Sequence, residues 1–290
     1  MYEKILVPLD GSELAEQAIP YVEQLAQRLK SEVILITVCL PGDPLERALA
    51  EYAERRAEKI QSLGVNTRSL CIEGDPADSI INFTGKNNVG LIVISTHGKT
   101  GVGHWPLGSI ASKVVQRSNI PVFLVRSSQP GKAPADNELG KILVTLDGSP
   151  FSEAIIPYAE KLAKNMNSEV TLLRVIEPAK LPQLAAYRDR EKYEKDFMAK
   201  MEREAERYLD KKKTALENKG VNVNSAFLIG KPVETILQYT EDKSVNLIAL
   251  TTHGFSGITK WTYGSVASKI IEGSPKPILL VRPPLPASKT

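Results

Sequence analysis

Two aspartates are the first residues of the chain whose type and position suit ligand binding. Asp10 and Asp147 each follow a short apolar run, Ile5–Leu9 and Ile142–Leu146, and each precedes Gly-Ser. A carboxylate at the end of a buried strand can accept hydrogen bonds from a ligand amine or hydroxyl. The same three residues also turn a chain from a strand into a helix, so the sequence leaves both roles open.

A longer pattern follows a later apolar run in each half. It reads Thr-His-Gly, nine residues, then Gly-Ser, and it occurs at residues 96–109 and 252–265. Glycine lets the backbone pass close to a bulky anion, and a helix that opens after the last glycine leaves its first N–H groups unpaired. Those donors and the positive end of the helix dipole favour a phosphate. The pattern predicts an anion site in each half, with an ordinary glycine turn as the alternative.

The anion contact alone is too weak to hold a ligand. A helix dipole contributes about 0.3–2 kcal/mol, whereas micromolar binding needs about 8 kcal/mol. If the ligand is a nucleotide, its base and sugar must therefore be held elsewhere. His97 and His253 could contact a phosphate when protonated or could hydrogen-bond within their own loops, and we favour the second role.

These patterns occur twice because the chain contains two copies of one domain. Asp10 and Asp147 are 137 residues apart and His97 and His253 are 156 apart, so the second copy carries 156 − 137 = 19 additional residues between these points. We place the first domain at 1–127, a Ser-, Pro- and Gly-rich linker at 128–137, the second domain at 138–283 and a loose tail at 284–290.

Apolar runs alternate with helical periodicity in each domain. The strand candidates of the first domain are Ile5–Leu9, Val33–Val38, Asn66–Ile72, Leu91–Ser95 and Val122–Val125. This alternation predicts two tandem α/β domains, each a doubly wound parallel sheet with helices on both faces. Ligands of such sheets bind at the carboxyl ends of the strands.

Two predicted helices have unusual features. One begins after Ser12 as N-cap and runs to Leu29 with Pro20 inside it, where we expect a kink, and Pro157 occupies the same place in the second domain. The other lies in the additional stretch of the second domain, Tyr187–Glu217, where apolar side chains recur every four residues. That amphipathic helix covers its own sheet or binds a partner.

Composition and missing motifs argue against several classes of protein. The net charge of +3, without a Lys/Arg run among aromatics, argues against a nucleic-acid partner. The apolar runs are too short to span a bilayer, and Met1–Lys4 lead straight into the first strand, which leaves no room for a signal peptide. We therefore expect no membrane association and a cytoplasmic location. GxSxG, GxxxxGK[ST] and metal-ligand spacings are absent, so we expect no catalytic set and no metal site. Cys39 and Cys71 lack CxxC spacing and are interpreted as buried apolar side chains, with a redox pair as the alternative.

The repeated patterns resemble the universal stress protein family in a tandem two-domain form. The family's glycine signature is G-x2-G-x9-G-[ST], and both copies keep its last three elements but carry Ser95 and Thr251 in place of the first glycine. The resemblance covers nearly the whole chain outside the linker and the tail. It implies a five-stranded parallel sheet of order 3-2-1-4-5 in each domain and, in the ATP-binding branch, ATP over the strand ends, with or without Mg²⁺.

The resemblance also implies roles for individual residues. In the first domain the adenine side would be held by Asp10 with Pro8 and Val38, and the ribose and phosphates by Gly98, Gly108 and Ser109, beside Ser95 and His97. The corresponding residues of the second domain are Asp147, Thr145, Val175, Thr251, Gly254, Gly264 and Ser265. Because Thr251 is β-branched and stiffer than Ser95, we expect the first domain to bind nucleotide more readily.

We therefore expect an ATP-binding regulatory protein of the stress response. One alternative is an interaction module of the same fold that binds no nucleotide. Another is a slow ATPase, although no base or nucleophile stands out in the sequence. The family pattern implies that the last strands, within Pro121–Arg126 and Pro277–Arg282, pair inside the chain, and it leaves homodimer formation open.

Overall fold

The computed structural model of the protein describes residues 1–42, 44–98, 107–127, 139–177, 190–254 and 263–284. The first half contains β1 (Lys4–Pro8), α1 (Glu13–Glu16), α2 (Ile19–Leu29), β2 (Glu32–Cys39), α3 (Glu46–Gln61), β3 (Thr67–Glu73), α4 (Pro76–Asn87), β4 (Leu91–Ser95), α5 (Ser109–Arg117) and β5 (Val122–Val125). The second half contains β6 (Lys141–Thr145), α6 (Pro150–Glu153), α7 (Ile156–Met166), β7 (Glu169–Ile176), α8 (Arg190–Glu217), β8 (Asn222–Ile229), α9 (Pro232–Asp242), β9 (Leu247–Thr251), α10 (Ser265–Gly273) and β10 (Ile278–Val281). The predicted linker, and the predicted tail except residue 284, lie outside the described residues.

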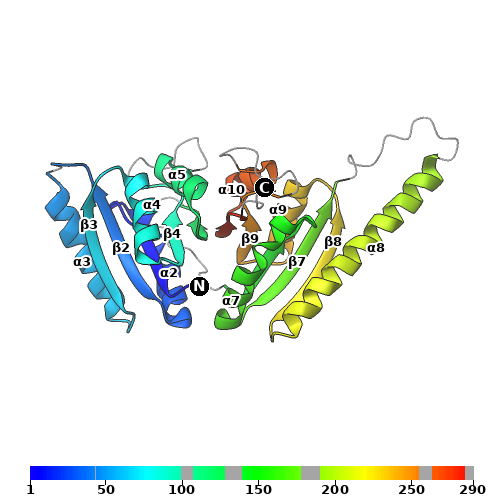
Figure 1. The fold of residues 1–290 in the computed structure, drawn as a ribbon, viewed down its shortest axis with the longest axis horizontal. Helices are drawn as coiled ribbons and strands as arrows, with labels where there is room; N and C mark the ends of the chain where they lie inside the picture. Colours follow the sequence, from blue (N-terminus) through cyan, green and yellow to red (C-terminus); the bar gives the residue numbers. More distant parts are fainter. Residues whose placement is uncertain (43, 99–106, 128–138, 178–189, 255–262, 285–290) are drawn as a thin grey trace, which may run out of the picture.

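The strands of both halves join into one ten-stranded sheet of order β3-β2-β1-β4-β5-β10-β9-β6-β7-β8. Within each half the strands pair parallel in the order 3-2-1-4-5, which confirms the predicted fold. The five strands predicted for the first domain differ from β1–β5 by at most one residue at either end. β5 and β10 pair antiparallel, so the predicted pairing of the last strands inside the chain is also confirmed. Figure 1 shows the two halves side by side, with β3 and β8 toward opposite ends of the molecule.

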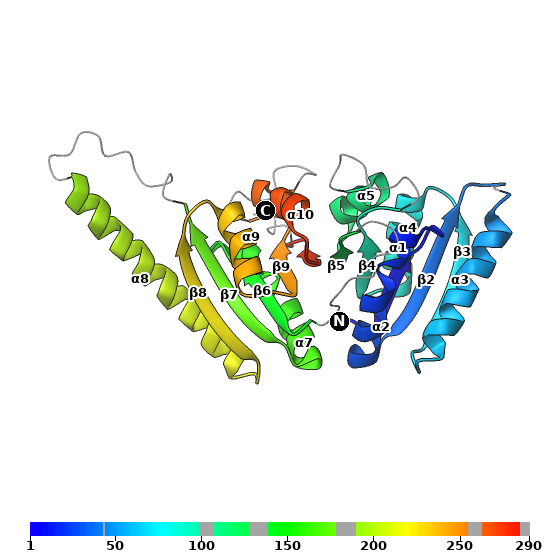
Figure 2. The ribbon, with the colours of Figure 1, turned by 180° about the vertical axis from the view of Figure 1, so that it is seen from behind.

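Helices cover both faces of this sheet, and each face has its own hydrophobic core. One cluster packs Leu35 and its neighbours with residues of α2, α3, α7 and α8, and the other packs Ile36 with residues of α4, α5, α9 and α10. Successive strand residues point to opposite faces, and Val33–Ile36 of β2 are all 0% exposed. Both clusters continue across β5 and β10, so the halves share their cores. Figures 1 and 2 show helices on both sides of the strands in each half.

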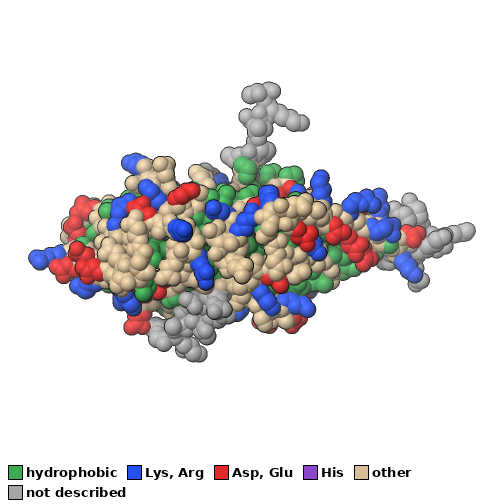
Figure 3. Space-filling view, turned by 90° about the horizontal axis from the view of Figure 1, so that it is seen from below, with side chains coloured by type: hydrophobic (Ala, Val, Ile, Leu, Met, Phe, Trp, Pro, Cys, Tyr) green, Lys and Arg blue, Asp and Glu red, His purple; other side chains and the backbone are tan. Residues whose placement is uncertain are grey.

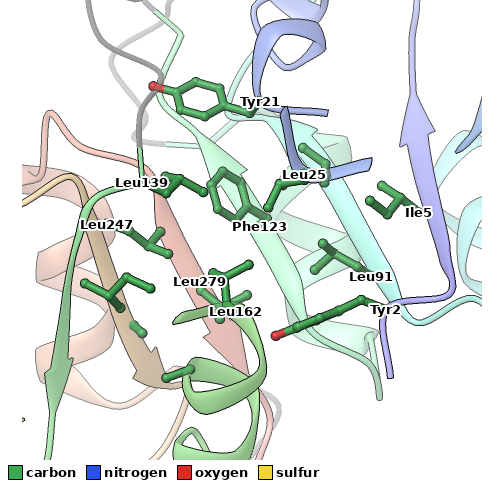
Figure 4. Packing of buried hydrophobic residues seen from close by; sticks show 14 of the residues in the cluster. Tyr2, Ile5, Tyr21, Leu25, Leu91, Phe123, Leu139, Leu162, Leu247 and Leu279 are labelled. Atoms are coloured by element: carbon green, nitrogen blue, oxygen red, sulfur yellow. The ribbon is translucent and has the colours of Figure 1, made fainter. Parts of the chain in front are cut away.

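The seam between the halves repeats the pairing of a two-fold dimer. Phe123 of β5 lies opposite Leu279 of β10, and the two residues hold equivalent positions in the repeat (279 − 123 = 156). Such self-complementary pairing is characteristic of an isologous interface. Figure 4 shows Phe123 between Tyr21 and Leu25 of the first half and Leu139 and Leu279 of the second. The rings of Tyr21 and Phe123 are 5.7 Å apart.

Two arginines next to the seam bind the other half. Arg126 donates through Nη1 to the carbonyls of Ile271 (3.3 Å) and Glu272 (3.1 Å) at the end of α10. Arg282 donates in the same way to the carbonyl of Gln116 (3.4 Å) at the end of α5. A cation suits the carboxyl end of a helix because the last carbonyls there lack partners within the helix.

Proline splits the predicted first helix instead of kinking it. Ser12 caps α1 as expected, since its Oγ accepts from the backbone N–H of Ala15 (3.1 Å). The structure then has two helices, α1 and α2, and Pro20 lies in the first turn of α2. A proline there loses no helical hydrogen bond because the first N–H groups of a helix have no acceptor. The prediction of one kinked helix was therefore wrong, and Pro157 begins α7 in the same way.

The additional stretch of the second half forms α8, which has 28 residues where α3 has 16. It lies along β8 and β7, with its first turns beyond the sheet (Figure 1). Ala205 (0% exposed) and Leu209 (2% exposed) are buried, and Leu209 belongs to the core of this face. α8 therefore covers its own sheet, which is one of the two roles predicted for this amphipathic helix.

The surface carries charges of both signs. Figure 3 shows Lys and Arg side chains interspersed with Asp and Glu on the face seen from below, in keeping with the small net charge of +3. Within the described part of the chain, every helix is too short or too polar to span a bilayer.

Candidate nucleotide site

Each half has a cavity at the carboxyl ends of its strands. The first-half cavity measures about 240 Å³ and the second-half cavity about 500 Å³. Both are formed by the ends of three strands and by residues of three helices, which are α1, α4 and α5 in the first and α6, α9 and α10 in the second, and α8 adds residues to the second. This is the location at which doubly wound sheets bind ligands. All the residues predicted for the site lie in these two walls: Pro8, Asp10, Val38, Ser95, His97, Gly98, Gly108 and Ser109 in the first, and Thr145, Asp147, Val175, Thr251, Gly254, Gly264 and Ser265 in the second.

The aspartate at the end of the first strand is held in place by the turn that follows it. The Oδ1 atom of Asp10 accepts from the backbone N–H (3.0 Å) and the hydroxyl (2.6 Å) of Ser12. In the second half Oδ1 of Asp147 accepts from the backbone N–H of Ser149 (2.9 Å). The two roles left open by the sequence therefore coexist, since each carboxylate organises its turn and also lies in a cavity wall.

The aspartate and the glycine pattern lie against each other. A Cβ atom on Gly98 would be 2.0 Å from Oδ2 of Asp10, and one on Gly254 would be 2.2 Å from Oδ2 of Asp147. Real Cβ atoms essentially never approach an oxygen within 3.0 Å, so only glycine allows the carboxylate this position. The structure thus brings together two motifs that lie far apart in the sequence.

The second glycine of the pattern begins a helix that is open to an anion. Gly108 is the N-cap of α5, and no side chain caps that helix. Ser109, its first residue, is exposed. Gly264 and Ser265 begin α10 in the same manner. Because the first residues of these helices line the cavities, each helix start can offer donors and a positive dipole end to an anionic group.

The residues that replace the family's first glycine have hydroxyls that bind the backbone. The hydroxyl of Ser95 donates to the carbonyl of Leu14 (2.7 Å) and lies 2.6 Å from that of Ser127. The hydroxyl of Thr251 donates to the carbonyl of His253 (2.7 Å). Both side chains are buried, so their polar atoms stabilise the strand ends.

The histidines are buried in their own loops. Nδ1 of His97 lies 3.2 Å from the hydroxyl of Thr96, and Nδ1 of His253 lies 3.0 Å from that of Thr252. His97 is in the wall of the first-half cavity, whereas His253 is not in the described wall of the second. Both histidines therefore contact residues of their own loops, and a contact between histidine and phosphate stays a prediction.

Other wall residues were not singled out by the sequence. Pro76 and Ile80 of α4 face the first-half cavity, and Pro232 and Ile236 of α9 face the second. The sequence could have identified these four residues, because the same residue types occur at equivalent positions in both halves. Arg174, at the end of β7, has no charged counterpart in the first half, so the repeat did not mark it.

Among the described residues, no three His, Cys, Asp or Glu side chains are grouped so that they could hold a metal ion. The acidic pair near the start of α4 has a structural role. Asp75 is the N-cap of α4 and accepts from the backbone N–H of Asp78 (3.0 Å), while Asp78 pairs with Arg117.

Comparisons with known proteins give one consistent result. The sequence profile described as the Universal stress protein family matches residues 1–126 and 138–282. A universal stress protein of Methanocaldococcus jannaschii is 30% identical over 141 residues, which cover 43% of this chain and 83% of that protein. One of Mycolicibacterium smegmatis is 24% identical over 301 residues, covering 96% and 97%. The crystal structure of a universal stress protein from Archaeoglobus fulgidus superimposes with a TM-score of 0.72 at 20% identity, covering 97% of this chain and 99% of that one.

Proposed function

Because the chain belongs to the universal stress protein family, with a match in each half, we propose that it is an ATP-binding regulator of the stress response. Each domain, 1–127 and 138–283, would hold one nucleotide site. One observation carries the proposal. In each half a single cavity is lined by a carboxylate, by the glycine that lies against that carboxylate and by the start of a helix without a side-chain cap.

The first-half cavity has a suitable group for each part of ATP. The phosphates would accept hydrogen bonds from the first N–H groups of α5 and from the hydroxyl of Ser109. The base would lie on the apolar wall at Val38 and Pro8, with its donors toward Asp10. Mg²⁺ carried by ATP would be coordinated mainly by the phosphates and water, as is usual for this ion.

A regulator must report that its site is filled, and the contacts of α5 and α10 suggest how. The start of α5 faces the first-half cavity, while its last turn accepts a hydrogen bond from Arg282 of the second half. α10 has the converse contact with Arg126. A shift of either helix on binding phosphate would therefore reach the other half through an arginine. The cytoplasmic location and a homodimer stay predictions of the sequence.

The proposal can be tested on the full-length purified chain. Denaturing it and analysing the released small molecules by mass spectrometry should detect an adenine nucleotide, and calorimetry should detect ATP binding. Adenosine alone and inorganic triphosphate alone should each bind more weakly than ATP, because each reaches one end of the site only. Finding no released nucleotide and no heat with ATP would refute the proposal and favour an interaction module of the same fold.

A further inference from the structure

The second-half cavity extends beyond the first-half cavity on one side. The second-half cavity is larger by 500 − 240 = 260 Å³, and its wall includes five further residues: Arg174, Ile176, Glu177, Phe197 and Met201. All its other wall positions have an equivalent in the wall of the first-half cavity. The added space therefore lies between the end of β7 and α8, next to Asp147.

Two exchanges between the halves change the side chains next to the Asp-Gly-Ser turn. Arg174 of β7 stands where β2 has Thr37, and Ala205 of α8 stands where α3 has Leu49. In the first half, the Cδ2 atom of Leu49 is 3.5 Å from the point that a Cβ atom would occupy on the glycine of the Asp-Gly-Ser turn. In the second half a guanidinium nitrogen of Arg174 comes within 2.9 Å of the equivalent point. A leucine side chain is thus replaced by a guanidinium beside the glycine that follows the aspartate.

The guanidinium of Arg174 is held by packing more than by hydrogen bonds. It lies over the ring of Tyr208, with its carbon 5.2 Å from the ring centre. Its Nε atom is buried and has no hydrogen-bond partner among the described residues. Stacking of this kind fixes the plane of an arginine, so the guanidinium of Arg174 has a fixed orientation in the cavity wall.

A nucleotide in this cavity would present its base to Asp147 and Arg174. The start of α10, at Gly264 and Ser265, is the anion end of the cavity, and Arg174 and Val175 of β7 form the opposite end. Asp147 lies between them at the end of β6, the strand between β9 and β7 in the sheet. Phosphates bound at α10 therefore leave the base edge to the carboxylate and the guanidinium.

A carboxylate beside a guanidinium matches the hydrogen-bonding edge of guanine. Guanine offers N–H donors at N1 and N2 to a carboxylate and the acceptors O6 and N7 to an arginine, whereas adenine presents an N6 amino donor where guanine has O6. We propose that the second-half cavity prefers guanine nucleotides over adenine nucleotides and that Arg174 sets this preference. This inference rests on the proposed nucleotide site, and it means that the two halves would bind different nucleotides.

The test uses the full chain with one site disabled at a time. In the Gly98→Ala chain the first-half site is weakened, so binding is measured at the second-half site, and the Gly254→Ala chain has the converse effect. Calorimetry with GTP and with ATP should show that the Gly98→Ala chain prefers GTP by roughly 5- to 150-fold, the range expected for a good bidentate base contact. The Gly254→Ala chain, as the matched control, should show no preference for GTP.

Substitutions at Arg174 separate base recognition from folding. Adding R174T and A205L to the Gly98→Ala chain restores the residue pair of the first half, and the preference for GTP should disappear. R174K keeps the charge but loses the planar pair of donors, so it should also lose most of the preference. General damage to the site would weaken both nucleotides alike and leave their ratio unchanged.

The outcomes are distinguishable. Equal affinity for GTP and ATP in the Gly98→Ala chain, or a preference that survives R174T with A205L, overturns the role of Arg174 while nucleotide binding itself stands. Binding of neither nucleotide to a folded Gly98→Ala chain overturns this inference and also the proposed function of the second half.

Discussion

Replacing Gly98 by alanine adds one methyl group at the point where the two motifs of the first-half site meet. The new Cβ atom would lie 2.0 Å from Oδ2 of Asp10, so the carboxylate must move by at least 3.0 − 2.0 = 1.0 Å to reach the shortest contact that real Cβ atoms show. The carboxylate is not free to move without cost, because its other oxygen accepts two hydrogen bonds from Ser12, at 3.0 and 2.6 Å.

The size of the effect follows from the contact with the base. The displaced carboxylate no longer accepts a hydrogen bond from the base, and a hydrogen bond to a charged group contributes about 1.5–3 kcal/mol. Binding of ATP to the first-half site should therefore weaken by about 10- to 150-fold. In a calorimetric titration of the full chain, the stronger binding event should be lost, while the weaker one should remain until Gly254→Ala is also introduced.

Gly85 offers a matched control. A Cβ atom on Gly85 meets nothing within 4 Å, and this glycine lies inside α4. Gly85→Ala should leave ATP binding unchanged and raise the free energy of unfolding by about 0.5–1 kcal/mol, since alanine favours a helix interior. Unchanged ATP affinity in Gly98→Ala, with the fold intact by circular dichroism, would refute the proposed roles of Asp10 and Gly98.

Further predictions concern the seam and the thiols. Phe123→Ala should lower the free energy of unfolding by about 3–5 kcal/mol, because Phe123 is 0% exposed at the centre of the seam; a urea midpoint equal to that of the parent chain would contradict this packing. Arg126→Ala removes two hydrogen bonds to the end of α10, so it should lower the free energy of unfolding by about 1–3 kcal/mol in the same measurement. A decrease below roughly 0.5 kcal/mol would show that the contact contributes little. Cys39 is 3% exposed and burial raises the pKa of its thiol to about 11, so iodoacetamide at neutral pH should label Cys71 before Cys39, as peptide mass spectrometry can show; faster labelling of Cys39 would contradict its burial.

The sheet was largely predictable because its strands are short apolar runs buried on both faces. Val33–Val38 illustrates this, since no amphipathic helix contains so continuous a set of β-branched and aliphatic residues. The aspartate and the glycine pattern were also identifiable, because repetition in the second half separated them from chance. Their mutual contact could be expected only from the rule that parallel strands end at one edge.

Other features depend on contacts between distant segments. The division into α1 and α2 depends on where the second helix begins relative to Pro20. Helix propensity alone allowed one kinked helix as well as two helices. The Arg174 guanidinium lies where the first half has the side chain of Leu49, and the residue equivalent to Leu49 is Ala205, on a helix that follows much later in the chain. A residue-by-residue comparison of the halves marks Thr37 and Arg174 as different, but it does not show that the difference opens a cavity.

The most direct test of the central claim is a crystal structure of the chain grown with saturating ATP. We expect a phosphate within hydrogen-bonding distance of the first N–H groups of α5 and the adenine edge at the carboxylate of Asp10. Density for ATP at any other place, or first-half cavities that stay empty at a concentration where ATP binds in solution, would contradict it.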